Sequence, residues 1–492
     1  MLLSVIAESL HGEIRGVGNP EITGISYDSR KVQPGNLFVC LQGIKSDGHD
    51  YGQEALERGA VAILVKFFLD DLSENIIQIK VPDTRGALAQ VSSLWYGFPD
   101  QKLRVIGVTG TNGKTTTTHL LKGLLEGERK KVGLVGTIHN MVGKDILPST
   151  HTTPESWELT GLFDQMVEKG VETVVMEVSS HALKQHRVAG CEFDVAVFTN
   201  LTQDHLDYHP DFDDYLASKL MLFENLHTGK KGGAKYAVIN GDDLRAEEFK
   251  RAVQERVPVW TYGIREMADV QAEDIKITPR GSTFDLIVNQ EIFPIKIPLV
   301  GIFNVYNVLA VITVALAEGI ALSHIAEFLE EAPQVAGRFE LVDEGQEFPV
   351  IVDYAHTPDG LENILSTAKE ITRGKLITVF GCGGDRDRGK RPIMGKISGL
   401  FSDFSFVTSD NPRSEEPIAI MKEIEKGISS VTSAYKMIEK RDMAINEAIQ
   451  MAGPEDMVII AGKGHEDYQL VQGKTLHFDD REVARQVLQR IR

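Results

Sequence analysis

Cysteines and long apolar runs are both scarce in this chain of 492 residues. The three cysteines, Cys40, Cys191 and Cys382, are scattered and form no CxxC pair. This spacing argues against a disulfide framework and against a cysteine zinc site, and it fits a reducing compartment. No apolar run reaches the ~18 residues of a transmembrane helix, and the acidic start lacks the basic region of a signal peptide. We therefore expect a cytoplasmic protein without membrane insertion.

Basic residues are also few relative to acidic ones. The chain has 52 Lys and Arg against 71 Asp and Glu, which gives a net charge of −19. Nucleic acids and acidic membranes require broad basic surfaces, so neither is an expected partner. The hydrophobic share of 42% and the charged share of 25% are typical of a globular protein. At about 150 residues per domain, the length predicts about three domains, and we expect a monomer.

Alternating strand and helix patterns divide the chain into three α/β domains. Short apolar runs separated by turns predict a small N-terminal α/β domain over residues 1–99. Residues 100–333 predict a central domain of the P-loop type with a doubly wound parallel sheet, followed from about residue 268 by shorter β-like runs. Residues 334–492 predict a C-terminal Rossmann-like α/β domain. Its polar groups follow the strands, where ligands bind in open sheets.

A glycine-rich motif, TGTNGKTT at residues 109–116, lies between a predicted strand and a predicted helix. Glycines let a backbone approach phosphates, and a helix N-terminus favours anions. Lys114 is expected at the β- and γ-phosphates and the Thr115 hydroxyl at Mg²⁺. The match to G-x-x-x-x-G-K-[ST] is partial because Val108 replaces the first glycine, so a plain glycine turn is the alternative. The residues predicted to bind ATP here are Gly110, Thr111, Asn112, Gly113, Lys114, Thr115 and Thr116.

Further polar groups follow in the central region. Glu177 ends an apolar run, where a carboxylate suits Mg²⁺ or bonds backbone N–H groups instead. Residues 199–209 are rich in His and Asp, a cluster that alone suggests zinc, but no thiolate accompanies it. Lys219 has the ordinary interpretation of a helix-face lysine that extends to water. Asn304 and Asn307 are one helical turn apart, and Asn304 is a candidate helix cap.

These motifs, in this order, resemble those of the Mur ligases and their relatives, the folylpolyglutamate synthetases. That family joins a carboxylate to an amine with ATP, through an acyl phosphate. The resemblance implies that Lys219 is carbamylated by CO₂ and becomes a metal ligand. It implies that the catalytic residues are Lys114, Glu177, His205 and Lys219, and that Mg²⁺ is held by Thr115, Glu177, His205 and carbamylated Lys219. It also implies nucleotide contacts for Asn304, Asn307, Arg338 and Asp353, with the asparagines at adenine.

The segment DNPR at residues 410–413 resembles the signature of those Mur ligases that add meso-diaminopimelate. This amine is similar to lysine but carries a second amino-acid head, whose carboxylate matches the planar fork of Arg413. Lysine would leave the fork unpaired, which disfavours lysine. The resemblance implies that diaminopimelate is bound by Arg386, Asp410, Asn411, Pro412, Arg413, Gly462 and Glu466.

Segments of the first two domains resemble those that hold the nucleotide-sugar substrate of the same enzymes. The assignment of these polar loop residues depends almost wholly on the resemblance. It implies that UDP-N-acetylmuramoyl-L-alanyl-D-glutamate is bound by Tyr27, Ser29, Ile44, Lys45 and Ser46 of the first domain. In the second domain it implies the same for Thr152, Thr153, Ser179, Gln185 and Arg187.

We therefore predict an ATP-dependent ligase of peptidoglycan synthesis that forms ADP, with Mg²⁺ as cofactor and ATP as co-substrate. It is expected to add meso-diaminopimelate to the D-glutamate of the UDP-muramoyl dipeptide. The alternatives are the same ligation with L-lysine, and a nucleotide-binding scaffold that lost catalysis. A folate-type ligase is a weaker third, since DNPR and the first-domain segments do not suit it. Because the nucleotide residues lie on two domains, catalysis is expected to need domain closure.

Overall fold

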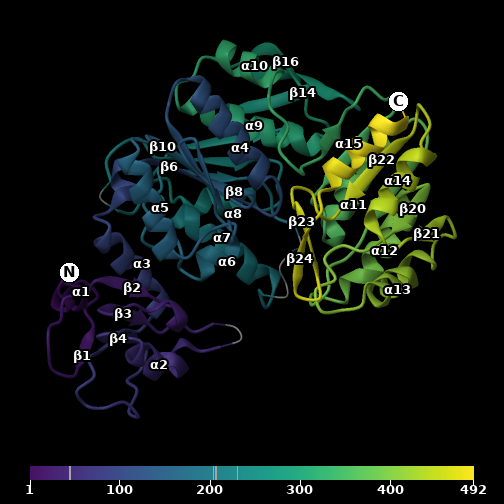
Figure 1. Cartoon of the computed structure of the whole chain (residues 1–492). Coiled ribbons are helices and arrows are strands. Elements are labelled where there is room, and N and C mark those ends of the chain that lie inside the picture. The colour runs from purple at the N-terminus through teal and green to yellow at the C-terminus, as the bar shows by residue number, and fades with distance from the viewer. Residues whose placement is uncertain (44–45, 203, 205–207, 230, 492) are drawn as a thin grey trace.

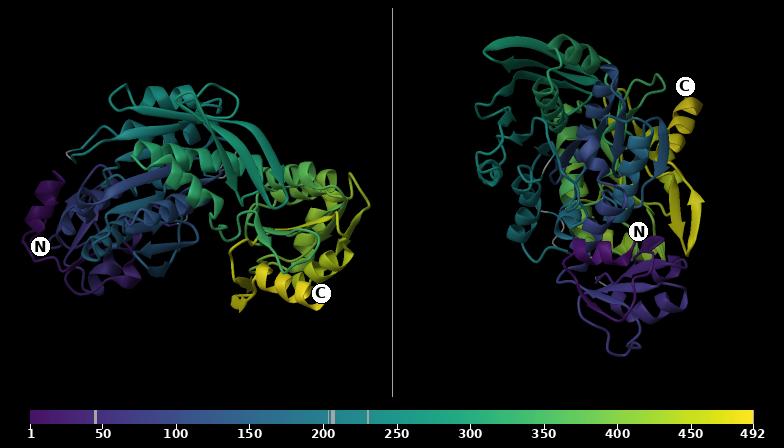
Figure 2. Two further views of the ribbon diagram at one scale, coloured as in Figure 1. Left: turned by 90° about the horizontal axis from the view of Figure 1, so that it is seen from above. Right: turned by 90° about the vertical axis from the view of Figure 1, so that its left-hand side faces the viewer.

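The computed structural model describes residues 1–43, 46–202, 204, 208–229 and 231–491. Figure 1 shows three lobes that follow one another along the chain, with the N-terminal and C-terminal lobes at opposite ends of the central one. The two further views of Figure 2 show the same arrangement. Within the described residues no helix combines the length and the apolar character needed to cross a membrane. Ile44, Lys45 and His205 of the predicted site lie outside the described residues.

The N-terminal domain is a small sheet with helices on both faces. Its elements are α1 (Leu3–Ser9), β1 (Glu13–Arg15), β2 (Gly24–Ser26), η1 (Ser29–Lys31), β3 (Asn36–Val39), η2 (Gly48–Tyr51), α2 (Gly52–Glu57), β4 (Ala62–Val65), β5 (Gln78–Lys80) and α3 (Thr84–Trp95). The strand order is β1-β5-β4-β3-β2, and all neighbours are parallel except β1 and β5. Helices α1 and α3 pack on one face and α2 on the other.

The central domain contains the largest sheet. Its elements are η3 (Pro99–Lys102), β6 (Arg104–Thr109), α4 (Lys114–Gly127), β7 (Val132–Val135), β8 (His139–Val142), β9 (Asp145–Pro148), α5 (Ser156–Glu168), β10 (Thr173–Glu177), α6 (Ser180–Lys184), β11 (Val195–Phe198), α7 (Phe212–Glu224), β12 (Tyr236–Asn240), α8 (Ala246–Ala252), β13 (Val259–Gly263), β14 (Val270–Thr278), β15 (Gly281–Val288), β16 (Glu291–Ile297), α9 (Ile302–Ala317) and α10 (Leu322–Glu330). The order is β16-β15-β14-β13-β12-β11-β6-β10-β7-β8-β9. The strands from β14 to β7 are parallel, and antiparallel strands extend both edges.

The parallel part of this sheet is buried on both faces. Successive side chains of a strand point to opposite faces, so Val105 and Ile106 of β6 belong to different hydrophobic cores. Helices α4 and α9 cover one face, and α5, α7 and α8 cover the other. Covered parallel strands expose their carboxyl ends along one edge, which is where the phosphate loop and Glu177 lie.

The C-terminal domain has a second doubly covered sheet. Its elements are β17 (Glu340–Val342), β18 (Val350–Asp353), α11 (Pro358–Ile371), β19 (Leu376–Phe380), α12 (Lys390–Phe401), β20 (Phe404–Val407), α13 (Pro417–Ile428), β21 (Tyr435–Met437), α14 (Arg441–Met451), β22 (Met457–Ala461), β23 (Tyr468–Val471), β24 (Lys474–His477) and α15 (Asp480–Ile491). The order is β17-β18-β22-β19-β20-β21, parallel except for β17. Helices α11, α12 and α13 cover one face, α14 and α15 cover the other, and β23 and β24 form a separate hairpin.

The predicted α/β fold class is confirmed, including the central parallel sheet and the C-terminal α/β domain. Each of the three large sheets lies within one of the predicted domains, which supports the proposed division at residues 1–99, 100–333 and 334–492. One alternative is wrong: Asn304 does not cap its helix. Helix α9 begins at Ile302 after Gly301, and the Asn304 amide donates to Val300 O at 2.9 Å from inside the first turn.

Candidate active site

The phosphate loop joins β6 to α4 and requires glycine at two positions. Gly110 has φ +150° and Gly113 has φ +89°, conformations that side chains other than glycine disfavour. A Cβ on Gly110 would lie 1.9 Å from Thr199 Oγ1, and a Cβ on Gly113 would lie 2.3 Å from Asn307 Oδ1. The loop is therefore packed against β11 and α9 too closely for any side chain at these two positions.

Replacing Gly113 with alanine is expected to weaken ATP binding by about tenfold or more. The left-handed backbone costs about 1–2 kcal/mol for alanine, and the Asn307 contact adds to this cost. Calorimetric titration with ATP measures the effect. Gly127→Ala is the matched control, because Gly127 ends the same helix and has open space around it. Equal affinity of both variants would contradict the prediction.

Two lysine ammonium groups meet at one backbone carbonyl of this loop. Lys114 Nζ donates to Gly110 O at 2.8 Å and to Thr111 O at 2.9 Å, and Lys219 Nζ donates to the same Gly110 O at 2.8 Å. Lys219 is buried in α7. Burial lowers the pKa of Lys219 well below its ordinary value, and the charge of Lys114 lowers it further. Burial also lowers the pKa of Lys114.

Glu177 lies at the end of β10, fully buried beside the loop. Its carboxylate accepts hydrogen bonds from Thr115 Oγ1 at 3.0 Å, from Thr137 Oγ1 at 2.9 Å and from Thr137 N at 2.8 Å. A hydroxyl and a carboxylate oxygen next to a phosphate loop are the donors that Mg²⁺ prefers. Thr115 and Glu177 therefore fit a magnesium ion. The alternative interpretation, in which Glu177 bonds a backbone N–H group, is also confirmed, because Thr137 N donates to its carboxylate.

The C-terminal domain reaches the phosphate loop directly. Arg338 Nη2 donates to Thr115 Oγ1 at 3.1 Å. Asp359, at the start of α11, accepts from Asn112 Nδ2 and from Thr202 Oγ1, both at 3.2 Å. Arg338 Nε is buried and has no hydrogen-bond partner among the described atoms. An anionic oxygen beside Thr115 would satisfy that donor, so Arg338 suits a phosphate contact.

The remaining predicted nucleotide residues are buried. Asp353 accepts from Phe339 N at 2.6 Å and from Ala355 N at 2.7 Å, and burial raises the pKa of its carboxyl group, opposed by Arg338. Asn307 Nδ2 donates to Asn304 Oδ1 at 3.2 Å beneath the phosphate loop. The two asparagines thus share a face of α9 as predicted, and their contact with adenine stays a prediction.

The second-domain residues predicted to bind the dipeptide form one network. Thr153 Oγ1 donates to Glu177 O at 2.9 Å and accepts from Ser179 N at 3.1 Å, and Arg187 Nη1 donates to Thr153 O at 2.9 Å. Thr152 Oγ1 lies 3.0 Å from Thr137 Oγ1. Gln185 Oε1 accepts from Arg187 Nη2 at 2.8 Å. This network connects the proposed dipeptide site to the Glu177 strand.

Two glutamates accompany this network and were missed by sequence reasoning. Glu155 pairs with Arg187 at 3.0 Å and with Arg85 of α3 at 3.2 Å. Glu158 accepts from Tyr27 Oη at 2.7 Å and, together with burial, raises the pKa of Tyr27. Both glutamates follow HTTP in the chain, and only the packing of the first domain on α5 shows what they contact.

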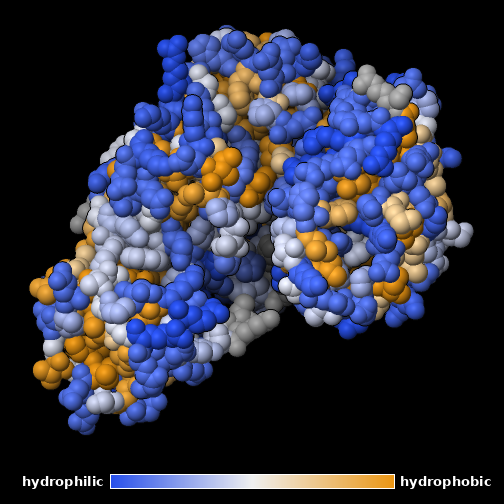
Figure 3. All heavy atoms as spheres, viewed as in Figure 1, coloured by the Kyte–Doolittle hydropathy of each residue, from blue (hydrophilic) through white to orange (hydrophobic). Residues whose placement is uncertain are grey.

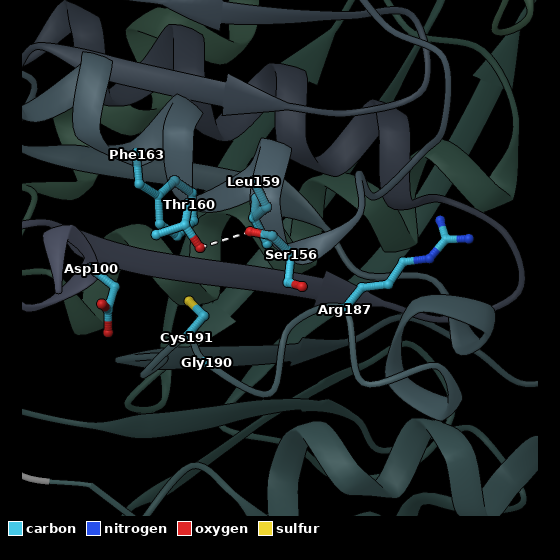
Figure 4. Close-up of a pocket in the computed structure, with 8 residues that line it drawn as sticks. All are labelled: Asp100, Ser156, Leu159, Thr160, Phe163, Arg187, Gly190 and Cys191. Atoms are coloured by element: carbon cyan, nitrogen blue, oxygen red, sulfur yellow. Dashed lines mark hydrogen bonds between the residues drawn. The ribbon is translucent and has the colours of Figure 1, made fainter. Parts of the chain in front are cut away.

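Arg187 also lines a cavity of about 10 Å³ within the central domain, together with Asp100, Ser156 and Cys191. Figure 4 shows the Arg187 guanidinium extending away from the other lining side chains. The cavity holds at most one water. In the first domain, Ser29 Oγ donates to Glu54 at 3.2 Å, and Ser46 lies in an exposed loop.

The DNPR segment follows β20 at the carboxyl edge of the C-terminal sheet. Asp410 and Asn411 are buried, and Asn411 Nδ2 donates to Glu466 Oε2 at 2.8 Å. A Cβ on Gly462 would lie 2.7 Å from Asp410 Oδ2. Burial raises the pKa of Glu466, as does the charge of Asp410, and Lys463 opposes both. The structure therefore brings together the predicted segments that follow β20 and β22.

Arg413 closes this segment and points its side chain at the loop after β19. Its Nη1 donates to Gly384 O at 2.8 Å, and within the described part of the chain it has no ion pair with a carboxylate. Pro412 is buried, whereas Arg386, on the facing loop, is exposed. Arg413 is thus a cation without an ion-pair partner in a segment that also holds Asp410, and Asn411 links this segment to Glu466. Together these groups of both charges suit a ligand with both an ammonium and a carboxylate.

Comparison with known proteins agrees with this geometry. Three family models match, described as the Mur ligase family catalytic domain at residues 21–96, the Mur ligase middle domain at 108–315 and the Mur ligase glutamate ligase domain at 337–464. The chain is 51% identical over 469 residues to the UDP-N-acetylmuramoyl-L-alanyl-D-glutamate–2,6-diaminopimelate ligase of Syntrophomonas wolfei, covering 95% of each chain. It is 48% identical to the enzyme of that name from Clostridium botulinum, covering 100% of each. This chain belongs to the Mur ligase family.

Solved structures also support the assignment of this chain to the Mur ligase family. A structure of a UDP-N-acetylmuramoyl-L-alanyl-D-glutamate–2,6-diaminopimelate ligase is 34% identical, with TM-score 0.67, and the match covers 96% of this chain and 95% of the other. The MurF ligase from Thermotoga maritima in complex with ADP is 19% identical, with TM-score 0.61 over 90% of this chain and 94% of the other, and supports the fold alone.

A buried arginine of this Mur ligase, missed by sequence reasoning, anchors the loop that faces Arg413. Arg391 is fully buried at the start of α12 and pairs with Glu415 and Glu423, each at 2.8 Å. Arg391 Nη2 also donates to Gly383 O at 3.2 Å. In the sequence Arg391 is one of three arginines in DRDRGKR, and nothing there marks it as the buried one.

Replacing Arg391 with methionine is expected to destabilise the C-terminal domain by about 2–3 kcal/mol. This loss is smaller than that of breaking a fully buried ion pair, because the side chains of the two glutamates are 22% and 20% exposed. Arg391 lowers the pKa of Glu415 to about 2. Because the folded-state pKa is lowered, this contribution is full above the unfolded pKa near 4.5 and is lost as the pH falls toward 2. Calorimetry should show the variant and the native protein converging as the pH approaches 2. Arg388→Met, at an exposed residue of the same loop, is the control.

Proposed function

We infer that this chain is an ATP-dependent, ADP-forming ligase of peptidoglycan precursor synthesis. It joins meso-diaminopimelate to the D-glutamate carboxylate of UDP-N-acetylmuramoyl-L-alanyl-D-glutamate. The observation that carries this function is Arg413. It lies in the DNPR loop of a Mur ligase that is about half identical to diaminopimelate ligases over nearly its whole length, and it has no carboxylate partner in the described structure.

The first step transfers the γ-phosphoryl group of ATP to the D-glutamate carboxylate. The loop residues 110–116 cradle the phosphates through backbone N–H groups and the N-terminus of α4. Lys114, which now donates to its own loop, turns to the β- and γ-phosphates, and Arg338 adds a second cation from the other domain. Both cations neutralise charge that builds on the transferred group, which is where such groups accelerate the reaction.

Mg²⁺ is proposed as the cofactor. Thr115 and Glu177 would hold it, with carbamylated Lys219 and His205, which lies outside the described residues, as further ligands. When bound, the ion neutralises phosphate charge and orients the phosphates. The lowered pKa of Lys219 supports the carbamate, because only the neutral amine reacts with CO₂. Carbamylation would also replace a cation beside Lys114 with an anion, which removes a like-charge contact.

The second step is attack of an amino group of diaminopimelate on the acyl phosphate. Arg413 is proposed to bind the carboxylate of the distal head, and Glu466, beside Asn411, to bind its ammonium. Asp410, Pro412 and Gly462 shape the pocket between these groups. Arg386, on the loop that faces Arg413, is proposed to hold a carboxylate.

The UDP-muramoyl dipeptide is proposed to lie between the first two domains. Thr152, Thr153, Ser179, Gln185 and Arg187 would hold the dipeptide end, since their network ends at the Glu177 strand. Tyr27, Ser29 and Ser46, with Ile44 and Lys45, would hold the UDP end. We further propose that the enzyme is a cytoplasmic monomer that uses the nucleotide-linked, water-soluble precursor.

Phosphate release tests the function. The purified protein is given ATP, Mg²⁺ and the UDP-muramoyl dipeptide, with meso-diaminopimelate or L-lysine in parallel, and Lys114→Met is the inactive control. Release with diaminopimelate alone is expected. Release with lysine would support the ligase activity but contradict the proposed role of Arg413. No release with either amine, from folded protein, would point to a scaffold or to another acceptor.

A further inference from the structure

The hairpin β23–β24 stands apart from the three large sheets. Its turn residues, Gln472 and Gly473, have φ +46° and +76°, which match the tight turn that fits the twist of two antiparallel strands. A two-stranded hairpin alone is only marginally stable in water. Figure 1 shows it at the edge of the C-terminal domain that borders the space between the lobes. Contacts beyond its own ladder must therefore hold it in place.

The partner of the hairpin is the DNPR segment. Leu470 N donates to Asn411 Oδ1 at 2.9 Å, and Leu470 O accepts from Arg413 N at 2.9 Å. Gln472 N donates to Arg413 O at 2.7 Å, and Arg413 forms a parallel bridge with Val471. The backbone N–H and C=O of Arg413 are thus both bound by β23 and its turn. Arg413 thus adds a single bridge to the outer edge of the hairpin.

Side chains strengthen this attachment. Gln469 Nε2 donates to Asp410 O at 2.6 Å. Lys463, which is fully buried, donates to Tyr468 O and lies 3.3 Å from Glu466 Oε2. Neither Gln469 nor Lys463 was singled out from the sequence. Together they connect β23 to Asp410 and to Glu466, two residues of the proposed diaminopimelate pocket.

Arg413 has a backbone conformation that needs such support. Its φ of +53° is left-handed, which is unfavourable for a residue with a Cβ. Residues persist in this region only where the surroundings impose it, often at binding sites. In this conformation the guanidinium donates to Gly384 O at 2.8 Å, on the loop that follows β19. An Arg413 that relaxed to an extended backbone would point its fork elsewhere.

We propose that the hairpin β23–β24 determines amine specificity by holding Arg413 in the left-handed conformation that aims its guanidinium at the distal carboxylate of diaminopimelate. Leu470 and Gln469 are the positioning residues, acting through Arg413 and Asp410. The proposal rests on the proposed function, because it requires diaminopimelate to bind at Arg413. It predicts that damage to the hairpin contact alone relaxes discrimination against lysine.

The register of the hairpin provides a matched pair of variants. Leu470 is paired with Thr475, and both peptide groups of Leu470 face the DNPR segment and not β24. In an antiparallel ladder the opposite residue then also points its peptide groups away from the partner strand. Proline at either position therefore removes no ladder bond. Leu470→Pro removes the donor to Asn411, whereas Thr475→Pro, at an exposed residue, leaves the DNPR contact intact.

Steady-state kinetics with diaminopimelate and with lysine test the proposal. Leu470→Pro is expected to raise KM for diaminopimelate about tenfold, the effect of one lost hydrogen bond of this kind. Its kcat and its KM for ATP should change little, and its preference over lysine should fall by a similar factor. Thr475→Pro should keep the native preference. Gln469→Leu, which leaves the backbone unchanged, should also raise KM for diaminopimelate and lower the preference over lysine. It replaces Leu470→Pro as the test if that variant does not fold.

The outcomes separate this inference from the function. A native enzyme that does not use diaminopimelate would refute the function itself. A native enzyme that selects diaminopimelate, combined with unchanged preference in both Leu470→Pro and Gln469→Leu, would overturn only the role of the hairpin. Equal loss of preference in Thr475→Pro would also overturn it, because the effect would then come from general damage to the hairpin.

Discussion

Lys219→Ala is expected to lower kcat about 10²–10³-fold, the loss typical of removing one group that stabilises transition-state charge. Lys219 is buried, and its amine lies on Gly110 O beside Lys114. As a carbamate it would supply a further anionic ligand for the Mg²⁺ proposed at Thr115 and Glu177. Alanine removes that ligand and leaves a cavity at the end of the side chain. Phosphate release at saturating substrates measures the effect.

The Lys219→Ala variant also offers a test of the carbamate. Short carboxylates such as acetate should restore part of its activity by filling the cavity with an anionic group. The native enzyme should lose activity when bicarbonate is removed, and the rescued variant should not. Lys122→Ala is the matched control, because Lys122 is a largely buried lysine of α4 that pairs with Glu126. Full activity of Lys219→Ala without any additive would rule out a ligand role.

Arg413→Ala is expected to lower kcat/KM for diaminopimelate about 10²–10³-fold, the value of a charge-assisted, two-point contact with a carboxylate. Activity with lysine should change little, because lysine offers the fork nothing to bind. The preference between the two amines should therefore collapse by the same factor. The measurement is kcat/KM for each amine under identical ATP and dipeptide concentrations.

Two further variants define which property of Arg413 matters. Arg413→Lys keeps the charge but lacks the planar fork, so it should recover only part of the preference. Arg388→Ala is the control, because Arg388 is an exposed arginine of the facing loop that pairs with Glu423. If Arg413→Ala retains the native preference, the carboxylate is bound elsewhere, and Arg386 would be the next candidate.

The two halves of the reaction are supplied by different lobes. The phosphate loop and Glu177 belong to the central domain, and the residues proposed to bind diaminopimelate belong to the C-terminal domain. Arg338 and Asp359 already link these lobes at Thr115 and Asn112. The space-filling view shows a hollow between the lobes with hydrophilic residues inside it (Figure 3). We propose that the C-terminal domain pivots at the nucleotide site to bring the amine to the acyl phosphate.

Much of the architecture was predictable from the sequence because its signals are local. The buried strands, such as β6, β10 and β22, are short apolar runs bounded by polar or glycine residues, and β-sheet burial on both faces demands that pattern. Glycines at 110 and 113 were expected from the loop motif, and their left-handed backbones explain why no other residue fits. Chemistry at strand ends was predicted for the same reason, since carboxyl ends of parallel strands share an edge.

Contacts between distant segments were decided only by the tertiary structure. Lys219 was expected to extend to water on helix pattern alone, and only the packing of α7 shows it buried on Gly110 O. Arg391 is a buried cation in a segment that looks exposed, because ion pairing with Glu415 and Glu423, far along the chain, offsets its desolvation. Lys463 is also buried, and its partners are the nearby Glu466 and the carbonyl of Tyr468.

By itself, the sequence determined the α/β class, the phosphate loop and the presence of an arginine suited to a second carboxylate. Each of these depends on residue types within a few positions of one another. The tertiary structure decided how that arginine is aimed. Its left-handed backbone is hydrogen-bonded at both its N–H and its C=O by β23 and the following turn, which lie more than fifty positions further along the chain, and no pattern within DNPR encodes that contact.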